Sequence, residues 1–204
     1  MSLFITFEGG EGCGKTFQSR ILFNKLFDTG ISAELTFEPG GTALGDKLRD
    51  LLKDKRKGDI SPEAELFLFA SCRVQLVADV ILPGLRKGKV MICDRFTDST
   101  LAYQGYGRGI DFSTIETINR LVTRGIKPDI TILLDVLPEE GLKRKHRKTN
   151  DRFEMEELDF HNRVREGYLA LASNEPERWL IINGSLSKAK ISETIWDQVS
   201  TRLS

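Results

Sequence analysis

The sequence predicts a single α/β domain in which a five-stranded parallel sheet is covered by helices on both faces. Three observations support this prediction: the chain length, the alternation of strand-like with helix-like segments, and the strongly apolar strand-like segments. At 204 residues the chain can bury one core and is short for two. Strands that are apolar on both faces are typical of a parallel sheet covered on both sides.

The predicted strands are short, β-rich apolar runs. They span residues 3–7, 32–37, 89–93, 130–134 and 179–182. Segments of helical period lie between them. One helix should follow Lys15 and stop near Gly30, because glycine commonly follows a helix end. Another should run from about residue 63 to 82 and end at Pro83.

The composition favours a soluble cytoplasmic protein. Thirty basic residues balance thirty acidic ones, so we expect no general attraction to nucleic acid or to an anionic membrane. The N-terminus lacks a basic leader, and no apolar run approaches the ~20 residues of a membrane span. The cysteines Cys13, Cys72 and Cys93 are odd in number and widely spaced, which indicates reduced, buried thiols.

Residues 9–16 match the pattern G-x-x-x-x-G-K-[ST] directly after a predicted strand and before a predicted helix. Such glycines let backbone N–H groups surround phosphate oxygens, while Lys15 reaches the β and γ phosphates and the Thr16 hydroxyl binds Mg²⁺. The alternative, an ordinary glycine-rich turn, explains neither Lys15 nor Thr16. The motif predicts a P-loop NTPase fold whose ATP-binding residues are Gly9, Gly10, Glu11, Gly12, Cys13, Gly14, Lys15 and Thr16.

Asp94 ends a predicted strand and suits the second magnesium position, often reached through water. Taken alone, an aspartate after a strand is more often a cap or turn residue. The P-loop and the adjacent Arg95 favour the metal assignment here.

A P-loop does not by itself identify the phosphate acceptor. The chain has no Asn-Lys-x-Asp guanine signature and is too short for motor machinery. Several separated arginines instead lie at the ends of predicted elements, where they could bind a second anionic substrate. A phosphate acceptor that carries a phosphate of its own would account for their positions. These arginines are Arg49, Arg73, Arg95, Arg108 and Arg152.

Further motifs make the similarity specific. They are the stretches at residues 7–16, 38–42, 94–96, 102–105, 128–135 and 151–154. With them the chain resembles the bacterial thymidylate kinases from the first strand to the last helix. The resemblance implies a nucleoside monophosphate kinase-like fold, a homodimer, and phosphorylation of dTMP to dTDP with ATP and Mg²⁺. It further implies an acceptor-binding region at about residues 38–75 and a basic lid at about 139–155.

The resemblance also implies a set of site residues. It places Phe69 over the thymine face, Arg73 at the base carbonyl, Thr100 and Gln104 at the base edge, Tyr103 beneath the sugar, Arg49 and Arg95 on the acceptor phosphate, Glu11 at the sugar 3′-hydroxyl, and Asn183 beside the adenine. For Phe69 core packing is the alternative, because residues 67–69 form an apolar run.

The family carries its catalytic arginine either in the P-loop or in the lid. Gly12 assigns that role to the lid, where Arg144, Arg147 and Arg152 are the candidates. A solvated charge run is the alternative for some of these side chains. Phe37 departs from the pattern, because an arginine commonly precedes the Glu-Pro-Gly-Gly motif, and this puts one polar contact near the acceptor in doubt.

The expected reaction is a direct, in-line transfer assisted by Lys15, Asp94, Arg95 and a lid arginine. One alternative is a kinase for another nucleotide or a nucleoside. Another is a nucleic-acid-binding protein that uses ATP as a switch, which the balanced charge disfavours.

Overall fold

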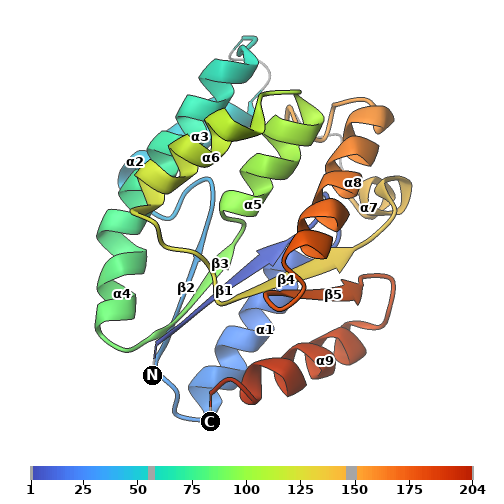
Figure 1. Ribbon diagram of the computed structural model, residues 1–204. Coiled ribbons are helices and arrows are strands. Elements are labelled where there is room, and N and C mark those ends of the chain that lie inside the picture. The colour runs from blue at the N-terminus through green and yellow to red at the C-terminus, as the bar shows by residue number, and fades with distance from the viewer. Residues whose placement is uncertain (1, 55–57, 146–150, 204) are drawn as a thin grey trace.

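The structure is a computed structural model, and it describes residues 2–54, 58–145 and 151–203. Its centre is a five-stranded, wholly parallel sheet with the order β2-β3-β1-β4-β5 (Figure 1). The strands are β1 (Leu3–Glu8), β2 (Ala33–Phe37), β3 (Val90–Asp94), β4 (Ile130–Asp135) and β5 (Trp179–Asn183). The predicted fold class is therefore confirmed, and each strand lies within one residue of its expected bounds.

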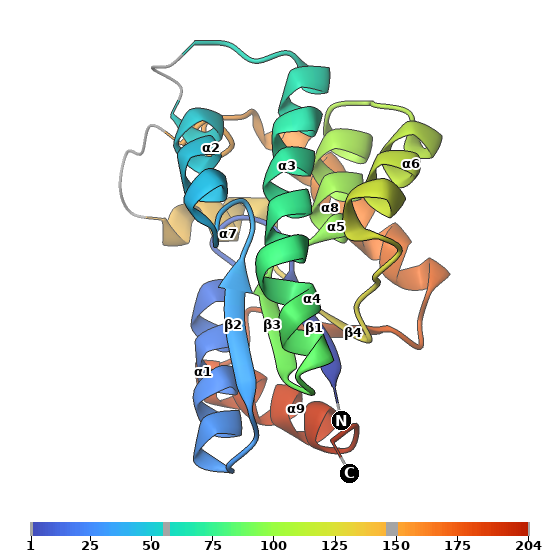
Figure 2. The same ribbon diagram turned by 90° about the vertical axis from the view of Figure 1, so that its left-hand side faces the viewer.

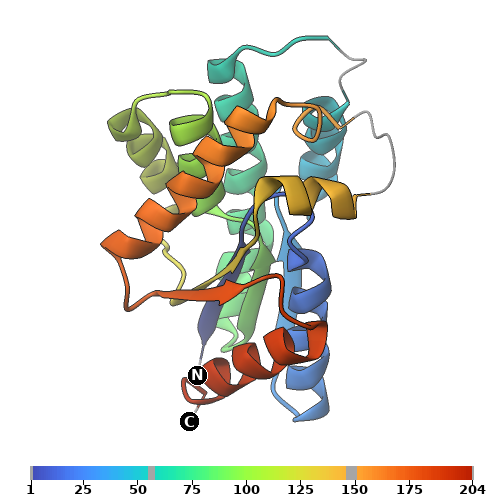
Figure 3. The same ribbon diagram turned by 90° about the vertical axis from the view of Figure 1, so that its right-hand side faces the viewer.

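Helices cover both faces of this sheet. They are α1 (Lys15–Asp28), α2 (Ala43–Lys53), α3 (Pro62–Leu76), α4 (Leu82–Arg86), α5 (Thr97–Thr100), α6 (Phe112–Thr123), α7 (Pro138–Arg144), α8 (Leu158–Asn174) and α9 (Lys188–Ser200). Two π-helical segments, η2 (Val77–Ile81) and η3 (Leu101–Gly107), interrupt the regular helices. Helices α1 and α9 lie together on one face, and α7 crosses near the carboxyl ends of the strands (Figure 3).

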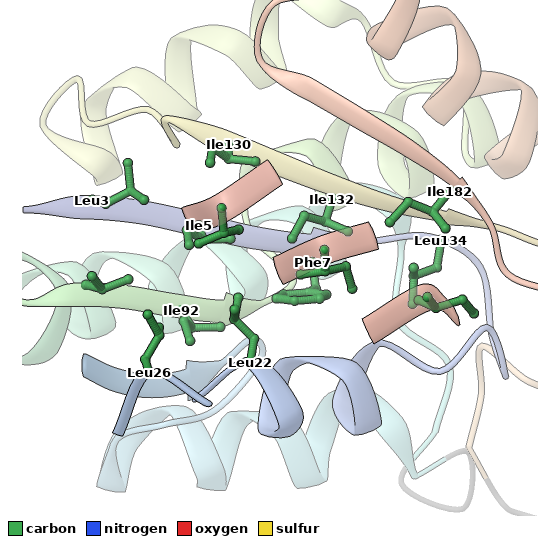
Figure 4. Packing of buried hydrophobic residues seen from close by; sticks show 14 of the residues in the cluster. Leu3, Ile5, Phe7, Leu22, Leu26, Ile92, Ile130, Ile132, Leu134 and Ile182 are labelled. Atoms are coloured by element: carbon green, nitrogen blue, oxygen red, sulfur yellow. The ribbon is translucent and has the colours of Figure 1, made fainter. Parts of the chain in front are cut away.

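Side chains of the central strands pack alternately toward the two helical layers. Leu3, Ile5 and Phe7 of β1 point into the cluster that includes Leu22 and Leu26 of α1 (Figure 4). Phe4 and Met91 instead join Leu76, Val77 and Ile81 on the opposite face. The period of two along a strand therefore supplies two cores from one apolar run.

Helix α1 ends as the sequence predicted. Gly30 has φ +77°, its N–H donates to the carbonyl oxygen of Phe27, and that of Ile31 donates to Leu26. This pair of bonds closes the helix end with a glycine in the left-handed region.

The segment Pro62–Arg86 is a continuous rod of α3, η2 and α4 (Figure 2), so the expected stop at Pro83 is wrong. Pro83 stands where η2 gives way to α4, and the wider π-helical turn before it, closed by the bond from the Leu82 N–H to the carbonyl oxygen of Val77, accommodates a residue that has no N–H. By length and composition this rod is apolar enough to cross a membrane, contrary to the sequence-based expectation. Its middle buries Arg73, α2 and α6 pack against α3, and 39% of its most apolar stretch is buried, so part of its apolar surface belongs to the protein core.

Candidate active site

A cavity of about 720 Å³ opens beside the carboxyl ends of the strands, where parallel α/β sheets bind ligands. It joins the P-loop to the region between α2, α3 and η3. The predicted site residues that line it are Glu11, Gly12, Gly14, Lys15, Thr16, Arg49, Phe69, Asp94, Arg95, Thr100, Tyr103, Gln104 and Arg144. The remaining described candidates, Gly9, Gly10, Cys13, Arg73, Arg152 and Asn183, are not among the residues that line it.

The P-loop conformation requires glycine at several positions. Gly9, Gly12 and Gly14 have φ values of +137°, +68° and +99°. A Cβ atom on Gly12 would lie 1.9 Å from the carbonyl oxygen of Gly141 in α7. Because backbone meets backbone there, an arginine at position 12 would displace α7. The absence of a side chain at Gly12 is thus what lets α7 approach the P-loop.

Lys15 is buried, with only 8% of its surface exposed. Its Nζ atom donates to the carbonyl oxygens of Gly9, at 3.0 Å, and Gly10, at 2.8 Å. Both partners belong to the P-loop itself. A phosphate bound in the loop would offer this ammonium group a charged acceptor in their place.

Thr16 and Asp94, the two residues expected to bind magnesium, lie side by side at the cavity. The Thr16 hydroxyl donates to Asp94 Oδ2 at 2.5 Å. Within the described part of the chain no group of three or more His, Cys, Asp or Glu side chains could hold a metal ion. A hydroxyl and one carboxylate nevertheless fit Mg²⁺, which takes few protein ligands and completes its shell with phosphate and water oxygens.

Arg95 follows β3 with φ +73° and turns its guanidinium group into the cavity. Its Nη2 atom donates to Glu11 Oε1 at 2.7 Å and to the Tyr103 hydroxyl at 3.1 Å, and that hydroxyl donates to Glu11 at 3.0 Å. Burial by itself would raise the pKa of Glu11, but Arg95, Lys15 and Lys145 outweigh it and hold this pKa well below its usual range. Glu11 is therefore a fixed negative charge and hydrogen-bond acceptor beside the P-loop.

Glu8, which was not among the predicted site residues, is linked to Arg95 through two hydroxyl groups. It is fully buried, and its Oε2 atom accepts hydrogen bonds from the hydroxyls of Ser99, at 2.6 Å, and Tyr168, at 2.9 Å. Both hydroxyls in turn accept from Arg95 Nη1 at 3.2 Å. Burial and the nearby Asp98 raise the pKa of Glu8 to about 7. A carboxylate inside the apolar strand β1 was the available signal, since such groups are rarely buried without a purpose.

The acceptor side of the cavity combines aromatic and polar groups. Phe69 is half-buried and stacks in a tilted arrangement on Phe153, with ring centroids 5.8 Å apart. Thr100 and Gln104 are each 1% exposed and line the same space. Tyr103 and Gln104 lie in η3, and π-helical turns are frequent at functional sites.

Arg49 of α2 and Arg73 of α3, both expected to contact the acceptor, have different surroundings in the structure. Arg73 is buried: Nε and Nη2 donate to Glu38 Oε2 at 2.9 and 2.6 Å, and Nη1 donates to Asn119 at 2.7 Å. Arg49 lines the cavity, donates to the carbonyl oxygen of Pro39 at 2.7 Å, and lies 5.2 Å from the centre of the Phe37 ring. Phe37, which stands where an arginine is common, therefore packs against the guanidinium group of Arg49.

The lid candidates occupy different places. Arg144 lines the cavity, and its guanidinium group donates to the carbonyl oxygen of Gly184 at 3.0 Å and to Glu140 at 2.5 Å. Arg152 is 8% exposed and lies 3.4 Å from Glu65, while its Nε and Nη2 atoms have no hydrogen-bond partner among the described residues. Arg147 lies outside the described residues.

Lys145 and Asn183 are two further residues considered for the edges of the site. Lys145, which the sequence analysis did not name as a candidate, reaches Glu11 Oε2 at 3.3 Å and also bonds to Glu154. Its position within the basic run was the only signal for it. Asn183 ends β5, and its side chain accepts from the Ser185 N–H at 2.9 Å.

Comparisons with known proteins agree with one another. The model of the thymidylate kinase family matches residues 7–195. Thymidylate kinase from Dehalococcoides mccartyi is 50% identical to this chain over 203 residues, and the match covers 100% of the chain and 98% of the relative. Thymidylate kinase from Synechococcus sp. is 50% identical over 202 residues, and that match covers 98% of the chain and 96% of the relative. The crystal structure of thymidylate kinase from Ehrlichia chaffeensis is similar, with a TM-score of 0.81, 35% identity, and coverage of 97% of this chain and 98% of that one. The chain belongs to the thymidylate kinase family.

Proposed function

We infer that the protein transfers the γ-phosphate of ATP to dTMP, forming dTDP and ADP. Full-length similarity to thymidylate kinases favours this reaction over phosphorylation of another acceptor and over nucleic-acid binding. The observation that carries it in this chain is one cavity that joins a P-loop to a pocket lined by Phe69, Arg95 and Tyr103. Such a cavity holds a nucleoside triphosphate and a nucleotide in contact.

On the donor side, Gly9–Thr16 binds the phosphates of ATP through backbone N–H groups, and Lys15 turns from its loop carbonyls to the β and γ phosphates. Thr16 and Asp94 hold Mg²⁺. When bound, the ion neutralises charge on the phosphate oxygens. Asn183 borders the adenine.

On the acceptor side, Arg49 and Arg95 bind the phosphate of dTMP, since a guanidinium group pairs with phosphate through two parallel hydrogen bonds. Glu11 accepts from the sugar 3′-hydroxyl, and Tyr103 packs beneath the sugar. Phe69 stacks on the base, whose edge meets Arg73, Thr100 and Gln104. Arg73 retains one N–H that no described hydrogen bond uses, which is enough for a base carbonyl.

Transfer is direct and in line, because positioning and cations stabilise the transition state without a covalent intermediate. Residues from about 139 to 155 act as the lid, and those from about 38 to 75 as the acceptor-binding region of the single domain. Arg144 already lines the cavity, so it needs a smaller rearrangement than Arg152 to reach the transferred group. Arg147 stays a third candidate.

The protein acts in the cytoplasm as a homodimer. Phe67 and Val74, seven residues apart on α3, are 59% and 41% exposed, and Leu121 on α6 is 76% exposed. Helices α3 and α6 pack together, so these side chains supply apolar surface on adjoining helices that a second copy would bury. Sedimentation equilibrium tests this: a monomer at micromolar concentration would contradict the dimer.

The function is tested by ADP release with ATP and a panel of acceptors. The panel is dTMP, dUMP, dCMP, dGMP, thymidine and buffer alone. We expect dTMP to give the highest kcat/KM. Equal release without an acceptor would make the protein an ATPase, and preference for another member of the panel would identify a different kinase.

A further inference from the structure

Glu65 is a buried carboxylate between the acceptor pocket and the lid, and the mechanism above does not use it. It lies in the first turn of α3 and is 1% exposed. Its Oε1 atom accepts from Gln104 Nε2 at 2.8 Å and from Arg108 Nε at 3.2 Å. Its Oε2 atom lies 3.1 Å from Arg108 Nη2 and 3.4 Å from Arg152 Nη2.

These contacts determine the orientation of the Gln104 side chain. A carboxylate accepts hydrogen bonds and does not donate them, so Gln104 must turn its NH₂ group toward Glu65. The opposite orientation would place two acceptor oxygens 2.8 Å apart and leave the buried NH₂ group without this partner. Gln104 lines the cavity, and its carbonyl oxygen is the end of the amide left for a ligand.

Arg108 keeps Glu65 in this position. Besides its two contacts with Glu65, it pairs with Glu156 at 2.7 Å, and its guanidinium group lies 4.6 Å from the centre of the Phe160 ring. The guanidinium groups of Arg108 and Arg152 also offset the charge of Glu65 inside the protein. These partners therefore hold the Glu65 carboxylate beside Gln104.

We propose that Glu65 is a positioning residue for base recognition, which fixes the Gln104 carbonyl oxygen toward the acceptor pocket. This inference rests on the proposed function. A fixed acceptor oxygen pairs with a base that carries a ring N–H at its hydrogen-bonding edge, as thymine and uracil do. Cytosine presents an unprotonated ring nitrogen there, so two acceptors would meet and both would stay unpaired. Glu65 thereby contributes to the choice of dTMP over dCMP.

The test is the ratio of kcat/KM for dTMP to that for dCMP, measured for the parent and for Glu65→Gln. A glutamine side chain at position 65 can either accept a hydrogen bond from Gln104 or donate one to it. Both orientations of the Gln104 amide then have a partner. We expect the ratio to fall by about tenfold, the effect of one hydrogen bond between neutral groups. A merely structural loss would lower both kcat/KM values and leave their ratio unchanged.

Asp98→Asn is the matched control. Asp98 is 3% exposed and accepts two hydrogen bonds from Arg178, so its loss disturbs a buried ion pair that does not include Gln104. This variant should keep the parent ratio. A fall equal to that in Glu65→Gln would assign the effect to general loosening and overturn the inference.

If Glu65→Gln does not fold, Glu65→Asp replaces it, because that variant keeps the charge beside Arg108 and withdraws the carboxylate from Gln104 by one methylene. A ratio within about twofold of the parent in the folded variant, below the size of one hydrogen bond, overturns the role of Glu65. A parent that forms no dTDP from dTMP refutes the proposed function instead. The two failures are thus distinguishable.

Discussion

Replacing Glu8 by glutamine should change how the stability of the protein depends on pH. Burial and the charge of Asp98 raise the pKa of Glu8 from 4.5 to about 7 in the folded protein. The folded state therefore holds this proton more tightly than the unfolded chain does. The stabilisation is fully present below about pH 4.5 and is lost as the pH rises through about 7. The difference between these two values corresponds to about 3 kcal/mol.

The assay is urea unfolding of the parent and of Glu8→Gln at a series of pH values from 5 to 8.5, at constant ionic strength. The glutamine does not titrate, so the parent should lose up to about 3 kcal/mol more than the variant over this range. Other titrating groups act in both proteins and cancel in the difference. Glu34→Gln is a control at a half-buried carboxylate paired with Lys89, and it should follow the parent. Parallel curves for the parent and Glu8→Gln, within about 1 kcal/mol, would refute the assignment.

Four further predictions concern the site. Lys15→Met should lower kcat by about 10²–10³ because it removes a cation that stabilises the transition state, and near-parent turnover in the folded variant would exclude Lys15. Phe69→Ala should weaken dTMP binding in calorimetry by about 1–3 kcal/mol and leave ATP binding unchanged; unchanged dTMP affinity with a loss of several kcal/mol in stability would make Phe69 a core residue. Tyr103→Ala should narrow the gap in kcat/KM between dTMP and its ribonucleotide analogue, and an unchanged ratio would place that discrimination elsewhere. Arg144→Ala or Arg152→Ala should lower kcat more than it raises KM; steady-state kinetics that leave both variants within about threefold in kcat would remove these two arginines from catalysis.

The sequence predicted the sheet because local pattern determines it. Each strand is an apolar run with no competing helical period. The P-loop motif adds that the run before it is a strand and the segment after it a helix. The helical rod from Pro62 to Arg86 was mispredicted because a proline stops a regular α-helix but is accommodated after a π-helical turn. The change to π-helical hydrogen bonding just before Pro83 leaves no mark in a sequence pattern.

Motifs predicted most of the candidate residues that line the cavity, but they did not predict the contacts of those side chains. Asp94 ends β3 and the P-loop follows the neighbouring strand β1, so the structure brings Asp94 next to Thr16 at the start of α1. The roles of Glu8 and Glu65 depend on partners 80 or more and 39 or more residues away, which a linear pattern does not reveal. Arg73 shows the same limit, since its ion pair with Glu38 joins two segments that each looked like ligand-binding motifs.

The central claim is that the protein moves the γ-phosphate of ATP onto dTMP. The most direct measurement follows the label from ATP labelled at the γ-phosphate, with dTMP present or absent, and separates the nucleotides and inorganic phosphate. We expect one labelled dTDP for each ADP, with little labelled inorganic phosphate, and transfer by Lys15→Met that is slower by about 10²–10³. Label that appears as inorganic phosphate, or that never enters dTDP, would contradict the account.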